Sequence, residues 1–393
     1  MEQNNGHHSG FPPRSPDRPG PYHRPPFLQI EDPRRRHRRL HHLQDIIVIA
    51  LCAVIANAQD WQQVEAFGRN RFDWLKRFLA LPNGIPSHDT FERVFDRLNP
   101  HAFQACFRGW VEAVSAALRI KHVAIDGKTL CGSGSAKLKP LHLVSAWASA
   151  QHLSLGQVAV AAKSNEITAI PLLLELLDLH GALVTIDAMG CQKEIAAKIV
   201  ECGGDYGLIV KSNHEHLFKD IQTVFGQALE NDFVGLEHDT YETHDKGHGR
   251  EEYRCCTVLH TTAGIRQAEE WKGLTTIGMY ISVRTVNGET SEEIRYFIGS
   301  KKASAKYYGK GLRNHWSIEN NLHWQLDITF GEDRNRVQRR NGAENLALLR
   351  RLTLVLLKAH PAEMSLAKKR YVASLDPEFL DEILRGDGIL EKR

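Results

Sequence analysis

The sequence predicts an α/β protein, with a mixed sheet flanked by helices, an N-terminal all-helical region and an inserted β element. Three observations lead to this fold class. Residues 41–118 carry helical patterns and no strand pattern. From residue 121, short apolar strands alternate with amphipathic helices, the order typical of a sheet covered by helices. Residues 214–300 interrupt that order with polar segments of alternating hydrophobicity.

Composition sets the outer limits. The chain has 393 residues, 42% hydrophobic and 25% charged, which is ordinary globular composition and long enough for two or three domains. The net charge of +3 indicates no particular partner. The seven cysteines include no CxxC pair, which favours a reducing cytoplasm without disulfides or structural zinc. The first apolar run, 46–58, has 13 residues, too few to span a membrane, so we expect neither a membrane segment nor a signal peptide.

The first 40 residues are rich in Pro, His and Arg, and the run PRRRHRRLHH at 33–42 is basic. We interpret residues 1–40 as a disordered, solvated tail. The alternative is an arm that binds phosphates without sequence preference.

Four helices are expected before the sheet. LQDIIVIALCAVIANA predicts a buried helix, and VEAFGRNRFDWLKRFLAL predicts a second. Pro82, Gly84 and Pro86 break the chain, and Ser87 or Asp89 can cap the next helix. HAFQACFRGWVEAVSAAL completes the set. Such a region could hold DNA or serve only as a scaffold.

The sheet region reads as three strands, helix, strand, helix, strand. KHVAID, LHLVSAWASA and LGQVAVAAK predict the first three strands, and a helix ending at Gly181 follows them. ALVTID and DYGLIVKS predict two more strands, on either side of the helix CQKEIAAKIVECGG. After the insertion, a long helix is expected from about Ser304 to Asp327, and another helix after Asn341.

Three carboxylates stand out in this topology. Asp126 ends the first predicted strand and Asp187 the fourth, so both can meet at one sheet edge, where open α/β sheets tend to place their sites. Glu319 lies in HWSIENNLHW, on the same helical face as His315, Trp316, Leu322 and His323. A carboxylate among apolar side chains needs a partner. Magnesium or manganese would relieve the repulsion of three converged carboxylates.

Each carboxylate also has an ordinary structural interpretation. Asp126–Gly127 is a hairpin-turn signal. Asp187 could cap the following helix. Glu319 could turn towards solvent. The GKT triplet that begins at Gly127 is no phosphate loop, because the required glycine five residues earlier is replaced by His122.

Five segments resemble one family. They are GIPSHDTFERVFDRL, VAIDGKTL, VTIDAMGCQKEIAAKIVECGGDYGLIVKSN, KGHGREEYR and HWSIENNLHWQLDITFGEDRNR. The chain resembles bacterial insertion-sequence transposases of the DDE type, and more narrowly the H-repeat-associated transposases, over nearly its whole length from about residue 28. Related DDE enzymes often carry Tyr, Arg and Lys at positions −7, −4 and +7 from the glutamate, where this chain has Leu312, His315 and Leu326.

The resemblance implies an RNase H-like core whose catalytic and metal-binding triad is Asp126, Asp187 and Glu319. It also implies an N-terminal helical domain associated with that core. We expect the chain to have four parts. They are a tail (1–40), a helical domain (41–118), a catalytic core (119–360) with its insertion at about 214–300, and a C-terminal helical tail (361–393).

The resemblance further implies a DNA transposase that catalyses metal-dependent strand cleavage and strand transfer. Two Mg²⁺ or Mn²⁺ ions would lie roughly 3.5–4 Å apart. The partners would be the DNA of the element ends and the target, and we expect a homodimer acting on cytoplasmic, nucleoid DNA. One alternative is an RNase H-like nuclease that cuts without joining. The other is a DNA-binding protein that has lost catalysis.

Further expectations concern single side chains. Lys128, Lys211, Arg250 and Arg313 are candidate phosphate contacts; each could equally be a solvated charge, and Lys211 and Arg250 are favoured. Trp316 and Trp324 are expected in the core, with base stacking as the alternative. Without metal, apolar neighbours and the two aspartates should raise the pKa of Glu319.

Overall fold

A computed structural model describes residues 30–115, 120–136, 138–160, 166–247 and 249–385. Before the sheet lie α1 (Leu43–Ile55), α2 (Trp61–Asn70), α3 (Phe72–Leu75), α4 (His88–Phe95) and α5 (Pro100–Ser115). As predicted, α1 is buried along nearly its whole length. The second predicted helix is broken into α2 and α3 at Arg71, whose guanidinium donates to the carbonyls of Ser374 and Leu375.

One continuous sheet forms the centre of the molecule, in the order β3-β2-β1-β4-β5-β9-β8-β7-β6. Its first five strands are β1 (His122–Thr129), β2 (His142–Ala148), β3 (Leu153–Val160), β4 (Leu183–Ile186) and β5 (Asp205–Val210). β1 is antiparallel to β2 and parallel to β4, and β4 is parallel to β5. This mixed order, with helices on both faces, is the RNase H-like α/β fold that was expected.

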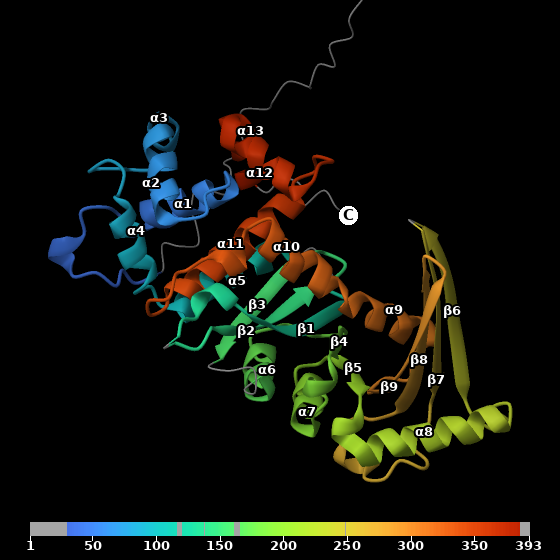
Figure 1. Cartoon of the computed structure of the whole chain (residues 1–393). Coiled ribbons are helices and arrows are strands. Elements are labelled where there is room, and N and C mark those ends of the chain that lie inside the picture. The colour runs from blue at the N-terminus through green and yellow to red at the C-terminus, as the bar shows by residue number, and fades with distance from the viewer. Residues whose placement is uncertain (1–29, 116–119, 137, 161–165, 248, 386–393) are drawn as a thin grey trace, which may run out of the picture.

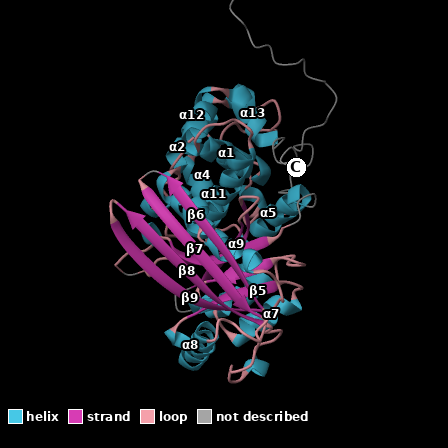
Figure 2. Ribbon diagram, turned by 90° about the vertical axis from the view of Figure 1, so that its right-hand side faces the viewer, coloured by secondary structure: helices cyan, strands magenta, loops and turns pink. Residues whose placement is uncertain are grey.

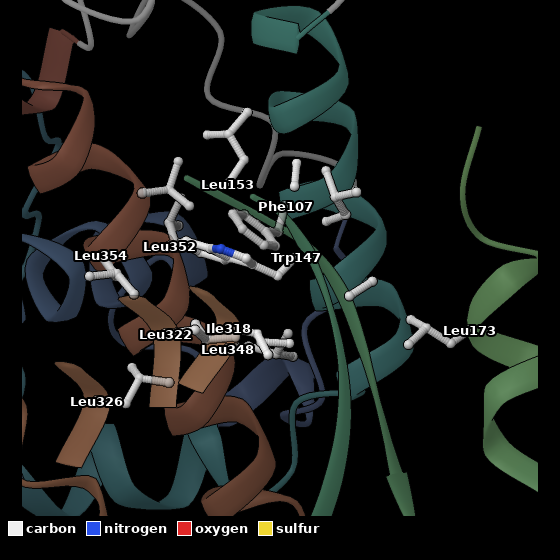
Figure 3. Packing of buried hydrophobic residues seen from close by; sticks show 14 of the residues in the cluster. Phe107, Trp147, Leu153, Leu173, Ile318, Leu322, Leu326, Leu348, Leu352 and Leu354 are labelled. Carbon is white, nitrogen blue, oxygen red and sulfur yellow. The ribbon is translucent and has the colours of Figure 1, made fainter. Parts of the chain in front are cut away.

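Helices cover the two faces of the sheet (Figure 1). α6 (Glu166–Leu174) and α7 (Lys193–Glu201) lie on one face, and the long helix α11 (Gly342–Ala359) lies on the other. The core beneath α11 surrounds Trp147 of β2, with Leu348 and Leu352 of α11 and Ile318 and Leu322 beside it (Figure 3). The segment that carries Glu319 is therefore fixed by its apolar residues against the centre of the fold.

The predicted insertion is present and antiparallel. It consists of α8 (Glu215–Glu230), β6 (His238–Gly247), β7 (Arg250–Leu259), β8 (Thr276–Val286) and β9 (Glu289–Gly299). Figure 2 shows its four long strands side by side. The insertion is not a separate unit, because β9 pairs with β5 and extends the central sheet to nine strands. This pairing covers the edge of β5, which would otherwise expose unpaired backbone groups.

The two predicted tails differ from expectation where the structure describes them. Residues 1–29 lie outside the described residues, but Ile30 is buried and Arg34 donates to Asp32 and to the carbonyl of His41. At the other end, α12 (Leu366–Leu375) and α13 (Pro377–Arg385) lie beside α1 (Figure 1). Arg370 of α12 donates to the carbonyl of Val54. These helices therefore pack with the N-terminal helices instead of forming a free tail.

Within the described residues, every helix is too short or too polar to cross a membrane.

Candidate active site

Asp126 and Asp187 lie at the same level of neighbouring parallel strands. Ile125 of β1 pairs with Ile186 of β4, and each aspartate is the next residue along its strand. The expectation that Asp126 ends its strand is wrong, as is the hairpin-turn alternative, because β1 continues in register with β2 as far as Thr129. The two aspartates therefore meet at the point where β4 ends, although β1 continues beyond it.

The glycine after Asp126 is required by packing. A Cβ atom at Gly127 would overlap the carboxylate of Glu166 and the ring of His142. These two side chains are buried, and His142 Nε2 lies 2.6 Å from Glu166 Oε1. His142 Nδ1 lies 2.8 Å from the Thr129 hydroxyl. The buried chain of contacts holds α6 against β1 and β2, and it explains the Asp-Gly pair without a turn.

Asp187 caps a short turn and still has an unused oxygen. Its Oδ1 accepts hydrogen bonds from the backbone N–H groups of Met189, at 3.1 Å, and Gly190, at 3.3 Å. The cap serves the 3₁₀ turn Ala188–Gly190, and α7 begins only at Lys193. Since both bonds end on Oδ1, the exposed Oδ2 is left for a ligand. Capping and ligand binding are therefore compatible at this residue.

The segment that carries Glu319 is helical but irregular. α9 (Ala305–His315) is followed by a π-helical turn, Glu319–His323, and then by α10 (Trp324–Ile328). A π turn shifts the faces of the helices before and after it, and such turns are frequent at functional sites. The single uniform helix expected from the sequence is therefore interrupted at the candidate residue itself.

The surroundings of Glu319 are not those expected from helical spacing. Leu322 and Leu326 point into the core (Figure 3), whereas the Glu319 side chain is 56% exposed. Trp316 and Trp324, expected in the core, are 45% and 53% exposed, and Arg295 stacks on Trp316. The apolar setting predicted for Glu319 is wrong, because the π turn separates the carboxylate from the leucine stripe.

Glu319 nevertheless meets Asp126, and His323 joins them. One ligand atom from each of these three side chains lies within 4.8 Å of the others. His323 Nδ1 is 3.5 Å from Asp126 Oδ2 and 3.6 Å from Glu319 Oε2. Asp187 lies outside this close group. The sequence placed His323 on the face of Glu319 without giving it a role; its i,i+4 spacing was the available signal.

Burial and neighbouring groups shift the pKa values of the two close carboxyl groups in opposite directions. Burial, with the negative charge of Glu319 nearby, raises the pKa of Asp126 to about 8. The His323 ring beside Glu319 lowers the pKa of that carboxyl to about 2. The predicted rise therefore falls on Asp126 and not on Glu319, because Asp126 is the more buried of the two.

A buried polar layer positions the helix behind the carboxylates. His122 Nε2 lies 2.8 Å from the Thr185 hydroxyl, which also lies 3.2 Å from His315 Nδ1. His122 Nδ1 contacts the hydroxyl of Ser149 at 3.0 Å. Burial lowers the pKa of His122 to about 3 and that of His315 to about 4. Both rings are therefore neutral near pH 7, and they join α9 to β1 and β4.

The four candidate phosphate contacts are placed differently. Lys128 is only 8% exposed, and its Nζ lies 2.6 Å from Asp327 and 3.1 Å from Asp333, so its charge is already paired with two carboxylates. Lys211 is exposed just after β5, at the sheet edge of Asp187. The two arginines are half-exposed: Arg250, the first residue of β7 in the insertion, contacts Glu252, and Arg313 of α9 contacts Asp245 of β6.

These donors fit a divalent cation. Asp126 and Glu319 bring carboxylate oxygens together, and the free Oδ2 of Asp187 lies at the same sheet edge. Magnesium and manganese prefer such oxygen ligands. His323 Nδ1, which lies 3.5 Å from Asp126 and 3.6 Å from Glu319, adds a nitrogen donor beside these oxygens. A cation beside Asp126 would also relieve the cost of burying that carboxylate next to another one.

Comparisons with known proteins identify the family of this chain. The family model described as "Transposase DDE domain" matches residues 118–356, and the "DDE_Tnp_1-associated" model matches residues 26–111. The chain is 37% identical over 369 residues to the "H repeat-associated putative transposase YhhI" of Escherichia coli K12, covering 92% of this chain and 97% of that protein.

Two further similarities were found. The chain is 40% identical over 362 residues to the "Putative transposase YncI" of Escherichia coli O157:H7, covering 90% of this chain and 92% of that protein. Among solved structures, the piggyBac transposase synaptic complex with hairpin DNA matches with a TM-score of 0.39 and 10% identity, over 92% of this chain and 75% of that one. The family models and the two curated relatives establish that this chain belongs to the DDE transposases, within the H-repeat-associated family.

Proposed function

We propose that this transposase cuts DNA strands at the ends of an insertion sequence and joins them to a target, using divalent metal held by Asp126, Asp187 and Glu319. One observation carries the proposal. Parallel strands bring Asp126 and Asp187 to the same sheet edge, and the Glu319 carboxylate reaches to within 4.8 Å of Asp126 from a segment far along the chain.

The chain's own groups then act by position and charge. Two bound Mg²⁺ or Mn²⁺ ions would activate the attacking water or 3′-hydroxyl and stabilise the leaving oxygen. The backbone cap fixes the Asp187 carboxylate, and His323 holds that of Glu319. Lys211, exposed at the same edge, would neutralise a phosphate. This chemistry needs no covalent protein–DNA intermediate and therefore no nucleophilic side chain.

The proposed partners and organisation follow from the same function. DNA of the element ends and of the target would cross the carboxylate edge, with Arg250 and Arg313 as contacts near the insertion. We assign catalysis to residues 119–360 and a DNA-binding role to the helices of residues 41–118. We further propose a homodimer that acts on nucleoid DNA in the cytoplasm.

A strand-joining assay tests the proposed function. The full chain is incubated with Mg²⁺, a duplex that carries the DNA ends flanking its own coding region, and a supercoiled target plasmid, and the products are sized. Joined products are expected. Cut ends without joined products would favour the alternative of a nuclease, and binding without cutting would favour a transposase that has lost catalysis.

Metal should stabilise the fold through Glu319. A hundredfold excess of Mg²⁺ over its dissociation constant should add about 2.7 kcal/mol to the free energy of unfolding. Thermal unfolding with and without Mg²⁺ measures this gain, which should shrink in Glu319→Gln. Asp327→Asn is the control, because Asp327 is held by Lys128 at 2.6 Å. If Asp327→Asn removed the gain and Glu319→Gln kept it, the third ligand would be wrongly assigned.

The basic run at 33–42 provides a separate prediction. Arg35 and Arg36 are exposed, whereas Arg34 is held by Asp32. If the run binds DNA, Arg35→Gln with Arg36→Gln should lower the log–log salt slope of nonspecific binding by up to about 1.8, at about 0.9 per lost contact. Fluorescence anisotropy at several salt concentrations measures this slope. An unchanged slope would mean that these two arginines are solvated surface charges.

A further inference from the structure

A cavity of about 350 Å³ lies between the N-terminal helices and the segment that follows the candidate site. α1, α2 and α4 contribute to one wall. Residues 335–339 and the N-terminal half of α11 contribute to the other. Its volume falls within the range of small-ligand sites. No residue of the candidate triad lines it, so this cavity is distinct from the carboxylate edge.

Two buried donors that line this cavity lack acceptors. Arg350 of α11 is 4% exposed, and its guanidinium has no hydrogen-bond or ion-pair partner among the described residues. Trp61 Nε1 is likewise buried without a partner there. Of the neighbouring buried arginines, Arg351 uses only its Nη1, which contacts Glu332 and the carbonyl of Ala347, and Arg370 donates to the carbonyl of Val54. Leaving a charged donor buried and unpaired is costly, so this cavity is built for an acceptor.

Charge indicates what kind of acceptor fits. Arg336 and Arg339 also line the cavity and are exposed at the surface; neither forms an ion pair within 4 Å in the described part of the chain, although the charge of Arg339 acts on Asp96. Two carboxylates line it too, Asp60 and Glu92, but Asp60 Oδ1 already accepts from the Gln63 N–H at 2.8 Å. Three guanidinium groups therefore face two carboxylates. The planar fork of arginine matches the oxygens of a phosphate group bidentately, as it does those of a carboxylate.

The position of the cavity points to DNA as the source of that phosphate. Asp333 contacts Lys128, two residues after Asp126 in β1. Arg336 follows Asp333 by three residues, which even in a fully extended chain span at most about 10 Å. Backbone phosphates follow one another about every 3.4 Å along a strand. A strand that is cut at Asp126 can therefore place another of its phosphates at Arg336.

We propose that Arg350, Arg336, Arg339 and Trp61 form a phosphate-binding pocket, which holds one backbone phosphate of the DNA while the carboxylate edge acts on another. Because residues of the N-terminal helices and of the core both line the pocket, a bound DNA strand would contact both parts of the protein. The identity of the bound molecule rests on the proposed function, but the pocket needs no metal and no triad residue.

The test is binding of the full chain to a short duplex in EDTA, where no cleavage occurs. Arg350→Met should lower the log–log salt slope by about 0.9, and Arg336→Gln with Arg339→Gln by up to about 1.8. Glu92→Gln should tighten binding, because it removes a negative charge from the pocket wall. Lys219→Gln is the control and should change nothing, since Lys219 is exposed on α8, outside the helices of residues 41–118, and is paired with Glu215.

The outcomes separate the possibilities. An unchanged salt slope in the exposed double variant Arg336→Gln/Arg339→Gln would overturn the proposal, whatever Arg350→Met does to folding. Inorganic phosphate is the second probe: if it raised the thermal stability of the wild type but not of Arg350→Met, while DNA slopes stayed equal, the pocket would serve a free anion and not DNA. If the variants showed the expected changes in salt slope but the wild type did not cut DNA in Mg²⁺, the result would count against the proposed function alone.

Discussion

Asp126→Asn, Asp187→Asn and Glu319→Gln should each abolish DNA cleavage in Mg²⁺ while leaving folding and DNA binding largely intact. Each change removes one metal-binding charge and almost no volume. Metal stabilisation of the transition state contributes several kcal/mol, so losing about 4 kcal/mol slows cleavage about a thousandfold. The measurement is the initial rate of cutting of a labelled duplex that carries the element end.

The matched control is Asp178→Asn, an exposed aspartate after α6 with the same change of charge and size. It should cut at the wild-type rate. Thermal unfolding and duplex binding in EDTA should be unchanged in all four variants. Near-wild-type cutting by any one of the three candidate variants would remove that residue from the proposed metal site.

The second large effect concerns stability. Glu332 and Arg351 form an ion pair in which both side chains are 0% exposed, with Arg351 Nη1 3.2 Å from Glu332 Oε1. Glu332→Gln should lower the free energy of unfolding by about 3–5 kcal/mol, because it leaves the arginine charge buried without a counter-ion. Denaturant unfolding, monitored by circular dichroism, measures the loss.

A double variant separates the pair from its surroundings. Glu332→Leu combined with Arg351→Met should recover most of the lost stability, because an apolar pair of similar volume has no desolvation cost. The coupling between the two sites is then positive and large. Single variants that cost less than about 1 kcal/mol would mean that water reaches the pair. Since Asp333 follows Glu332 and contacts Lys128, the same pair supports the loop beside Asp126.

Local patterns were sufficient to predict much of the fold. The strand-helix alternation after residue 121 is set by side-chain periodicity, which depends only on nearby residues. The sequence also predicted that Asp126 and Asp187 lie side by side, because each comes directly after apolar strand residues, and these two strands pair in parallel. The antiparallel insertion was visible for the same reason, in the alternating polar segments between residues 238 and 299.

Features that depend on distant contacts could not be predicted. From the sequence, Lys128 could be a free cation, but in the fold its Nζ donates a hydrogen bond to Asp327, which lies 199 residues along the chain. The exposure of Glu319 depends on a π turn, which period-3.6 spacing cannot show. The phosphate-binding pocket combines α2, α4 and α11, so Arg350 reads in the sequence as one more charge within an apolar helix.

The most direct test of the proposed metal site is the position of manganese in crystals of the full chain soaked with Mn²⁺, located by anomalous scattering. The predicted result is manganese bound by Asp126, Asp187 and Glu319, and lost from crystals of Asp187→Asn. Manganese bound instead by Asp327 and Asp333, or none at a concentration that supports cleavage, would contradict the assignment of these three carboxylates as the catalytic site.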